Sequence, residues 1–103
     1  MLTKDEARRV ALVALDIIQE MPGNADLDLM LIEPLVIESE LAWLFPFNTR
    51  EYVQTGNVGA MAVGVGPIVV NRATGIPFVA PPMPTEHLLA QYAASNGEVY
   101  NWF

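Results

Sequence analysis

The feature that most constrains this fold is a single long amphipathic helix at the start of the chain. Thr3 and Glu6 fit a capping box, in which the Thr3 hydroxyl accepts from the Glu6 backbone N–H and the Glu6 carboxylate reaches back to the Thr3 backbone. Pro22 ends the helix, which we place over residues 2–21. Apolar residues at helical spacing predict its buried face: Ala7, Val10, Ala11, Ala14, Leu15 and Ile18. Three more widen the apolar sector, so more than one face is expected to be covered: Leu12, Val13 and Ile17.

After residue 24 the apolar period changes to that of short strands. Residues 29–32 and 35–40 are β-type runs, and Pro34 between them favours a bend or an edge position. Pro46 lacks an N–H and indicates an edge or a bulge in the next run. That run, 41–47, is interpreted as one strand with three aromatic residues on the same face: Trp43, Phe45 and Phe47.

The second half of the chain predicts a hairpin and a closing helix. Residues 67–70 and 76–80 form two strands joined by a tight connection, in which Gly75 takes a positive φ. Thr85 is expected to cap a last helix that runs to about Ala94. Its inward-facing residues are Leu88, Leu89 and Tyr92.

This order of elements predicts an α+β fold. We expect an N-terminal helix packed on a small antiparallel sheet of three to four strands, with a short C-terminal helix. The 103 residues suit a single domain over 1–103. Residues 94–103 are expected to form an aromatic tail that carries Tyr100, Trp102 and Phe103.

Composition excludes several classes of protein. There is no cysteine, which excludes disulfide frameworks and thiolate metal sites. With 52% hydrophobic and 17% charged residues, the chain is too apolar to be disordered. A net charge of −7 repels phosphate backbones, so nucleic acid is not expected as a partner. The longest apolar stretches are too short for a signal peptide or a membrane span, so we expect a cytoplasmic protein with no membrane partner.

The residues needed for chemistry are sparse. The single histidine, His87, has no neighbouring set of ligands, and we expect neither a metal nor a cofactor. The two serines, Ser39 and Ser95, lie outside any nucleophile-elbow motif. We therefore expect a protein that is not an enzyme.

The charge is distributed unevenly along the chain. No Lys or Arg lies between Arg9 and Arg50, and this interval holds seven carboxylates. An acidic surface attracts a basic partner and speeds its association. The candidate partner-binding residues in this interval are Asp26, Asp28, Glu33, Glu38 and Glu40.

An ordered set of segments resembles a known family. A tryptophan-centred aromatic stretch at 42–47 (Ala-Trp-Leu-Phe-Pro-Phe) is followed by a Thr-Gly ending at 55–56. Gly-Val-Gly-Pro at 64–67 then leads into a strand, and the hairpin ends at Thr-Gly, 74–75. Residues 84–92 supply a proline, an acidic residue and a tyrosine in the last helix. In this order they resemble the immunity protein 35 family, also called YrhB-like.

The resemblance implies a role in binding. Members are thought to neutralise toxins of bacterial polymorphic toxin systems, so the first hypothesis is an immunity protein that binds a cognate toxin. The net charge favours a basic toxin, such as a nuclease. The second hypothesis is a small chaperone-like or scaffold domain, which would hold partly folded clients through the aromatic tail. The oligomeric state is open, and the wide apolar helix is compatible with a homodimer.

Overall fold

The computed structural model describes residues 1–22, 24, 27–62, 66–80 and 82–94. Asp26 and nearly all of the predicted aromatic tail lie outside the described residues. The helices are α1 (Lys4–Glu20), α2 (Arg50–Thr55) and α3 (Thr85–Ala94), with two short 3₁₀ turns, η1 (Glu33–Leu35) and η2 (Val58–Ala60). The strands are β1 (Leu29–Leu31), β2 (Ile37–Glu38), β3 (Ala42–Phe45), β4 (Phe47–Thr49), β5 (Ile68–Asn71) and β6 (Pro77–Val79).

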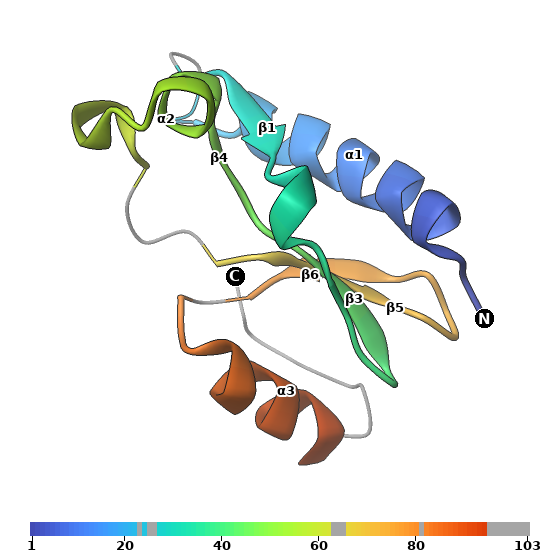
Figure 1. Cartoon of the computed structure of the whole chain (residues 1–103). Coiled ribbons are helices and arrows are strands. Elements are labelled where there is room, and N and C mark those ends of the chain that lie inside the picture. Colours follow the sequence, from blue (N-terminus) through green and yellow to red (C-terminus); the bar gives the residue numbers. More distant parts are fainter. Residues whose placement is uncertain (23, 25–26, 63–65, 81, 95–103) are drawn as a thin grey trace.

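The fold is α+β, as predicted. Four antiparallel strands form one sheet in the order β2-β3-β5-β6, and β1 pairs with β4 in a separate antiparallel ladder. Helix α1 lies along one face of the four-stranded sheet, and α3 lies on the other side (Figure 1). The predicted three to four strands therefore correspond to this sheet, and the β1–β4 pair is an addition to it.

Helix α1 begins where the capping box places it. The Thr3 backbone N–H donates to Glu6 Oε1 at 2.9 Å, and the Glu6 N–H donates to Thr3 Oγ1 at 3.2 Å. Its buried residues belong to the predicted face: Ala7, Ala11, Leu15 and Ile18. Small alanines at two of these positions let the helix axis approach the sheet closely. Leu12 is half-buried, but Val13 and Ile17 are exposed, so the predicted cover over the widened sector is wrong for those two.

Pro46 divides the segment that we predicted as one strand. Strand β3 ends at Phe45 and belongs to the four-stranded sheet, whereas β4 begins at Phe47 and pairs with β1. The Pro46 carbonyl accepts from the Ile32 N–H at 2.8 Å, where the chain passes between the two sheets. The single strand over 41–47 is therefore wrong, because a residue without an N–H sits where the ladder changes partner.

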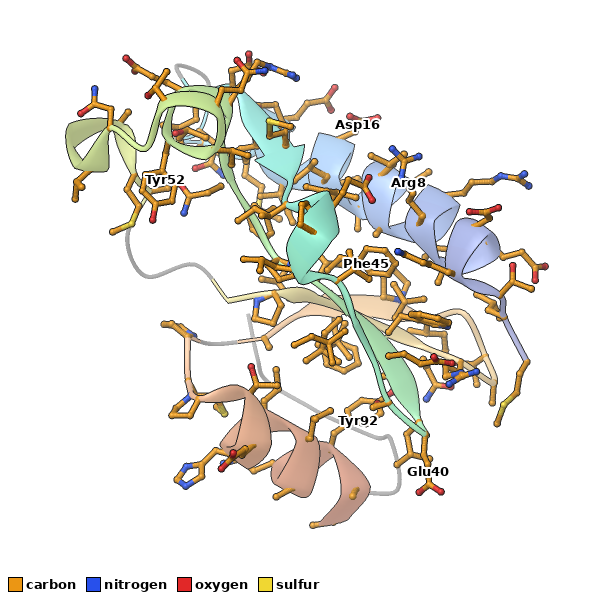
Figure 2. The ribbon with its side chains drawn as sticks, in the orientation of Figure 1. Arg8, Asp16, Glu40, Phe45, Tyr52 and Tyr92 are labelled. Atoms are coloured by element: carbon orange, nitrogen blue, oxygen red, sulfur yellow. The ribbon has the colours of Figure 1, made fainter. Side chains whose placement is uncertain are left out.

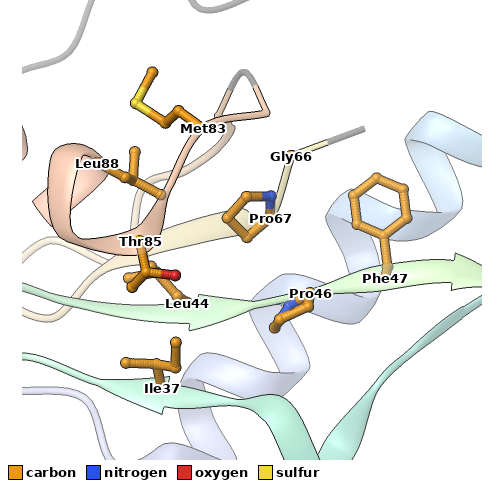
Figure 3. Close-up of a pocket in the computed structure, with 9 residues that line it drawn as sticks. All are labelled: Ile37, Leu44, Pro46, Phe47, Gly66, Pro67, Met83, Thr85 and Leu88. Carbon is orange, nitrogen blue, oxygen red and sulfur yellow. The ribbon is translucent and has the colours of Figure 1, made fainter. Parts of the chain in front are cut away.

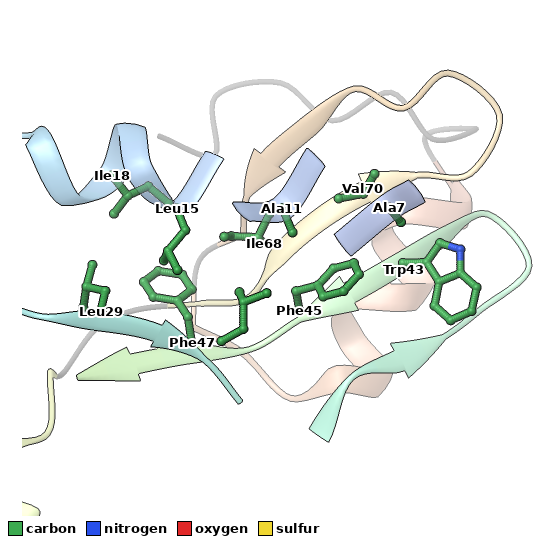
Figure 4. Packing of buried hydrophobic residues seen from close by; sticks show 11 residues of the cluster. Ala7, Ala11, Leu15, Ile18, Leu29, Trp43, Phe45, Phe47, Ile68 and Val70 are labelled. Atoms are coloured by element: carbon green, nitrogen blue, oxygen red, sulfur yellow. The ribbon is translucent and has the colours of Figure 1, made fainter. Parts of the chain in front are cut away.

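The prediction for the aromatic face is confirmed. Trp43, Phe45 and Phe47 all enter the cluster beneath α1, together with Ile68 and Val70 of β5 (Figure 4). Phe45 is completely buried there. A second, smaller cluster lies on the α3 side of the sheet: Ala42, Leu44, Val69, Ala80, Leu88 and Tyr92.

Two further predictions need correction. Residues 33–35 form the 3₁₀ turn η1 around Pro34, so the run 35–40 contributes only the two residues of β2. Helix α3 begins at Thr85 itself, so Thr85 is a helical residue and not the cap. The hairpin is as expected, with Gly75 at φ +74°.

Candidate partner-binding surface

The described candidate acids follow the chain along one side of the molecule. Asp28 precedes β1, Glu33 lies in η1 and Glu38 lies in β2. Glu40 lies at the tip of the β2–β3 hairpin, close to the end of α3 (Figure 2). We call Asp28, Glu33, Glu38 and Glu40 the acidic row. The row is extended along this path and does not form one compact cluster.

Arginines from other parts of the chain pair with three members of the acidic row. Arg8 Nε of α1 lies 2.6 Å from Glu33 Oε1. Arg50 Nε, at the start of α2, lies 3.0 Å from Asp28 Oδ2. The third pair joins Arg72 Nη1 to Glu38 Oε2 at 2.9 Å. The interval between Arg9 and Arg50 contains no basic residue, but in the folded chain arginines from outside it pair with its carboxylates.

These ion pairs leave the carboxylates partly accessible. The side chains of Asp28 and Glu38 are 71% and 57% exposed. Each carboxylate uses one oxygen for its arginine, and within the described chain the other oxygen makes no hydrogen bond. An ionised carboxylate has about four acceptor sites, so the row keeps acceptors for a partner's donors. Glu40 makes no ion pair with any described residue.

Arg72 is the most deeply anchored of the three bases. Its Nη1 also donates to the Ser39 carbonyl at 2.8 Å, and its guanidinium lies 5.0 Å from the centre of the Trp43 ring. The Trp43 Nε1–H donates in turn to the Leu2 carbonyl at 3.2 Å. The side chain of Arg72 is only 19% exposed, and its Nε is buried without a hydrogen-bond partner. This end of the acidic row is therefore held by contacts to two hairpins and the chain start.

An apolar groove lies on the opposite edge of the sheet. Val13 and Ile17 of α1, with Met21 just after the helix, form one wall, and Pro77–Val79 of β6 forms the other. The groove measures about 370 Å³. Val13 and Ile17 are 62% and 58% exposed although both are large and apolar. The widened apolar sector of the sequence pointed to these residues, but a pattern along one helix does not show which side the fold leaves open.

A second hollow lies under the start of α3. It measures about 210 Å³ and is lined by apolar residues of the sheet, such as Leu44, and by Leu88 of α3 (Figure 3). Among the described residues that line it, Thr85 supplies the one side-chain hydroxyl and none is ionisable. The described lining therefore offers apolar contact and no acid–base group.

The shifted pKa values belong to structural contacts. The Thr3 backbone N–H, followed by the Thr3 hydroxyl, holds the pKa of Glu6 below its ordinary value. Burial raises the pKa of Tyr92, and the hydrogen bond from Asn71 Nδ2 at 2.8 Å opposes that rise. Neither group lines the groove or belongs to the acidic row.

Within the described residues, no group of three His, Asp or Glu side chains could hold a metal ion. His87 lies on the exposed side of α3. No helix in the described ranges is long and apolar enough to cross a bilayer.

The fold and its surfaces define a small α+β domain with an ion-paired acidic row on one side and an apolar groove on the other. A family model described as immunity protein 35 matches residues 5–95 of this chain. The chain therefore belongs to the immunity protein 35 family, and the resemblance seen in the sequence is confirmed. Comparisons with curated proteins and with solved structures find no match.

Proposed function

We propose that this immunity protein binds and neutralises a cognate bacterial toxin of a polymorphic toxin system. The family match over residues 5–95 carries the proposal. Neutralisation requires only binding, with no chemical step and no cofactor. We further propose that the protein acts in the bacterial cytoplasm, before the toxin reaches its target.

The acidic row is the proposed contact surface for the toxin. Its carboxylates are exposed, and three of them are held in place by arginines. Carboxylates that are held before binding lose less conformational entropy when a partner arrives. With a net charge of −7, the chain attracts a basic toxin, such as a nuclease, over distances of about a Debye length, ~8 Å at physiological salt. We include Asp26 in the proposed contact surface because it lies two residues before Asp28 in the sequence.

Co-purification with the toxin encoded beside the gene tests the function. We expect a stable complex, and cells that express both proteins should survive. If the protein neither binds nor protects against a neighbouring toxin, the proposed function is wrong.

Charge-neutralising variants test the surface separately from the function. We expect the triple variant Asp28→Asn, Glu38→Gln, Glu40→Gln to associate with the toxin on the order of tenfold more slowly at low salt. The matched control is the triple variant Asp5→Asn, Asp16→Asn, Glu86→Gln, which also removes three exposed carboxylates but none of the row. An equal loss of rate in both variants would remove the acidic row as the contact surface.

The salt dependence of binding distinguishes the alternative role as a chaperone-like domain. Charge-steered association slows as salt rises, whereas apolar binding of an unfolded client does not weaken in that way. The aromatic tail that suggested this alternative lies outside the described residues. The acidic row lies within the described residues, and its exposed carboxylates favour the role of a toxin-binding protein.

A further inference from the structure

An exposed apolar ridge runs along α1. Val13 and Ile17 lie four residues apart in one row on the helix, and Met21, the C-cap residue that follows α1, lies four residues further along the chain. They are 62%, 58% and 40% exposed. The neighbouring strand β6 extends this apolar surface with Pro77 and Val79. Isolated apolar residues on a surface are ordinary, but a continuous ridge with a second apolar wall marks a contact site.

The adjoining sheet edge disfavours strand addition. Strand β6 is the outer strand of the four-stranded sheet, so one of its sides has no neighbouring strand. Its inner side pairs with β5, and just beyond the two strands the Ala80 N–H donates to the Pro67 carbonyl at 2.9 Å. Pro77 has no backbone N–H, so this short edge lacks one hydrogen-bond donor. A strand of another chain would therefore pair poorly with β6. The ridge therefore fits an occupant that contacts it through side chains.

The charged residues beside the ridge have opposite signs at its two ends. Arg9 lies four residues before Val13, and Glu20 lies three residues after Ile17. Both are exposed, and neither makes an ion pair with any described residue. The other three arginines are all paired within the chain. The exposed Asp16 lies four residues before Glu20 on the same flank, so the ridge offers a cation towards one end and two carboxylates towards the other.

We propose that the ridge is the interface between two copies of this chain, with the two α1 helices antiparallel about a two-fold axis. Such an arrangement places Val13 of one copy opposite Ile17 of the other, because the axis passes near the level of Leu15. It also brings Arg9 of each copy beside Glu20 of its partner. A two-fold interface uses the same patch twice, so each favourable contact occurs twice.

The antiparallel sense follows from the charges. Parallel helices would place Arg9 against Arg9 and Glu20 against Glu20, which is repulsive. The ridge and β6 supply fewer residues than the roughly 20–30 per side of a standard interface. We therefore expect a weak dimer whose population rises with concentration.

The dimer leaves the proposed toxin surface open. The ridge adjoins β6, whereas Glu38 of the acidic row lies in β2 at the other edge of the same sheet. The inference therefore does not depend on the proposed function. One chain could dimerise and bind a toxin at the same time.

The first experiment measures the molar mass of the full chain over a concentration series by sedimentation equilibrium. We expect the apparent mass to rise from 11.3 kDa towards twice that value. Ile17→Glu should remain at the monomer mass at every concentration, and circular dichroism should show an unchanged fold because Ile17 is exposed. The matched control is Val58→Glu, which alters a 71% exposed residue in η2 and should dimerise like the wild type.

Charge exchange tests the antiparallel register and keeps the proposal testable if Ile17→Glu fails to fold. Arg9→Glu alone and Glu20→Arg alone should each weaken the dimer roughly two- to thirtyfold, because each variant removes two symmetry-related exposed ion pairs. The double variant Arg9→Glu, Glu20→Arg should recover the wild-type dissociation constant. Failure of the double variant to recover it would overturn the antiparallel register.

One result would overturn the proposal as a whole: a wild-type chain that stays monomeric over the full concentration series. If Ile17→Glu then also loses binding to the neighbouring toxin, the ridge is the toxin's site instead. A dimer that binds no toxin would instead leave this inference intact and count against the proposed function.

Discussion

The two faces of the four-stranded sheet are covered very differently. Helix α1 has 17 residues and a complete capping box, and it closes a cluster that includes Phe45. Helix α3 has 10 residues and covers a smaller cluster, with a hollow of about 210 Å³ under its first turn. Leu44 and Phe45 are adjacent in β3 and point to opposite faces. The comparison indicates that the α1 face supplies most of the stability and that the α3 face is a thinner cover.

The largest effect is expected on the α1 face. Phe45→Ala should lower the free energy of unfolding by about 3–5 kcal/mol, because a fully buried ring is lost and a cavity remains. Equilibrium unfolding in urea measures the change. The control is Val58→Ala, an exposed apolar residue of η2 outside the ridge, which should change stability by less than about 0.5 kcal/mol.

The neighbouring residue tests the other face. Leu44→Ala should cost about 2–3 kcal/mol, toward the low end for a buried leucine, because Leu44 already borders a hollow and loses fewer contacts. The variant Phe45→Leu places a leucine on the α1 face, so that side chains of the same size can be compared on the two faces. If Leu44→Ala destabilises the protein more than Phe45→Ala does, the ranking of the two faces is wrong.

The helix start on the α1 face should contribute less. Thr3→Ala removes the cap and should cost about 1 kcal/mol. It should also raise the pKa of Glu6 part of the way towards its ordinary value, because the contribution of the Thr3 hydroxyl is lost while the larger one, from the backbone N–H of residue 3, remains. A lowered folded-state pKa stabilises the protein above the ordinary glutamate pKa, about 4.3. That stabilisation is lost as the pH falls through the folded-state pKa. Carboxyl titration by NMR checks the shift, and an unchanged Glu6 pKa in the variant would contradict it.

The smallest effect is expected from the polar contact on the α3 face. Tyr92→Phe removes the hydrogen bond from Asn71 and should cost about 0.5–1 kcal/mol. Because burial raises the pKa of Tyr92, its contribution is fully present below about pH 10 and is lost as the pH rises through the folded-state pKa. Absorbance titration of wild type against Tyr92→Phe should show one tyrosine that ionises late. A Tyr92 whose pKa is not raised above the ordinary tyrosine value would contradict this.

Local signals in the sequence predicted the parts of the fold whose causes are local. The capping box of Thr3 and Glu6 places the start of α1, and the positive φ of Gly75 makes the hairpin turn. The alternation of Trp43, Phe45 and Phe47 correctly predicted their shared face. The division at Pro46 was missed, because whether such a residue bends a strand or transfers it to another sheet depends on which strands are available to pair.

The acidic interval shows the same limit for the candidate surface. From the sequence, the stretch between Arg9 and Arg50 contains only acidic charges, and this predicted a strongly negative surface. The fold brings Arg8, Arg50 and Arg72 to it from up to 34 residues away, since Arg72 pairs with Glu38. Sequence distance does not report such pairings.

The sequence by itself determined the α+β class, the start of α1, the absence of cysteine chemistry and the resemblance to the immunity protein 35 family. These depend on composition, on periodicity and on contacts between residues that are close in the chain. Only the tertiary structure decided which carboxylates are ion-paired and which apolar side chains of α1 stay exposed. Both depend on which segments, distant in the sequence, pack against these side chains, and only the folded molecule determines that packing.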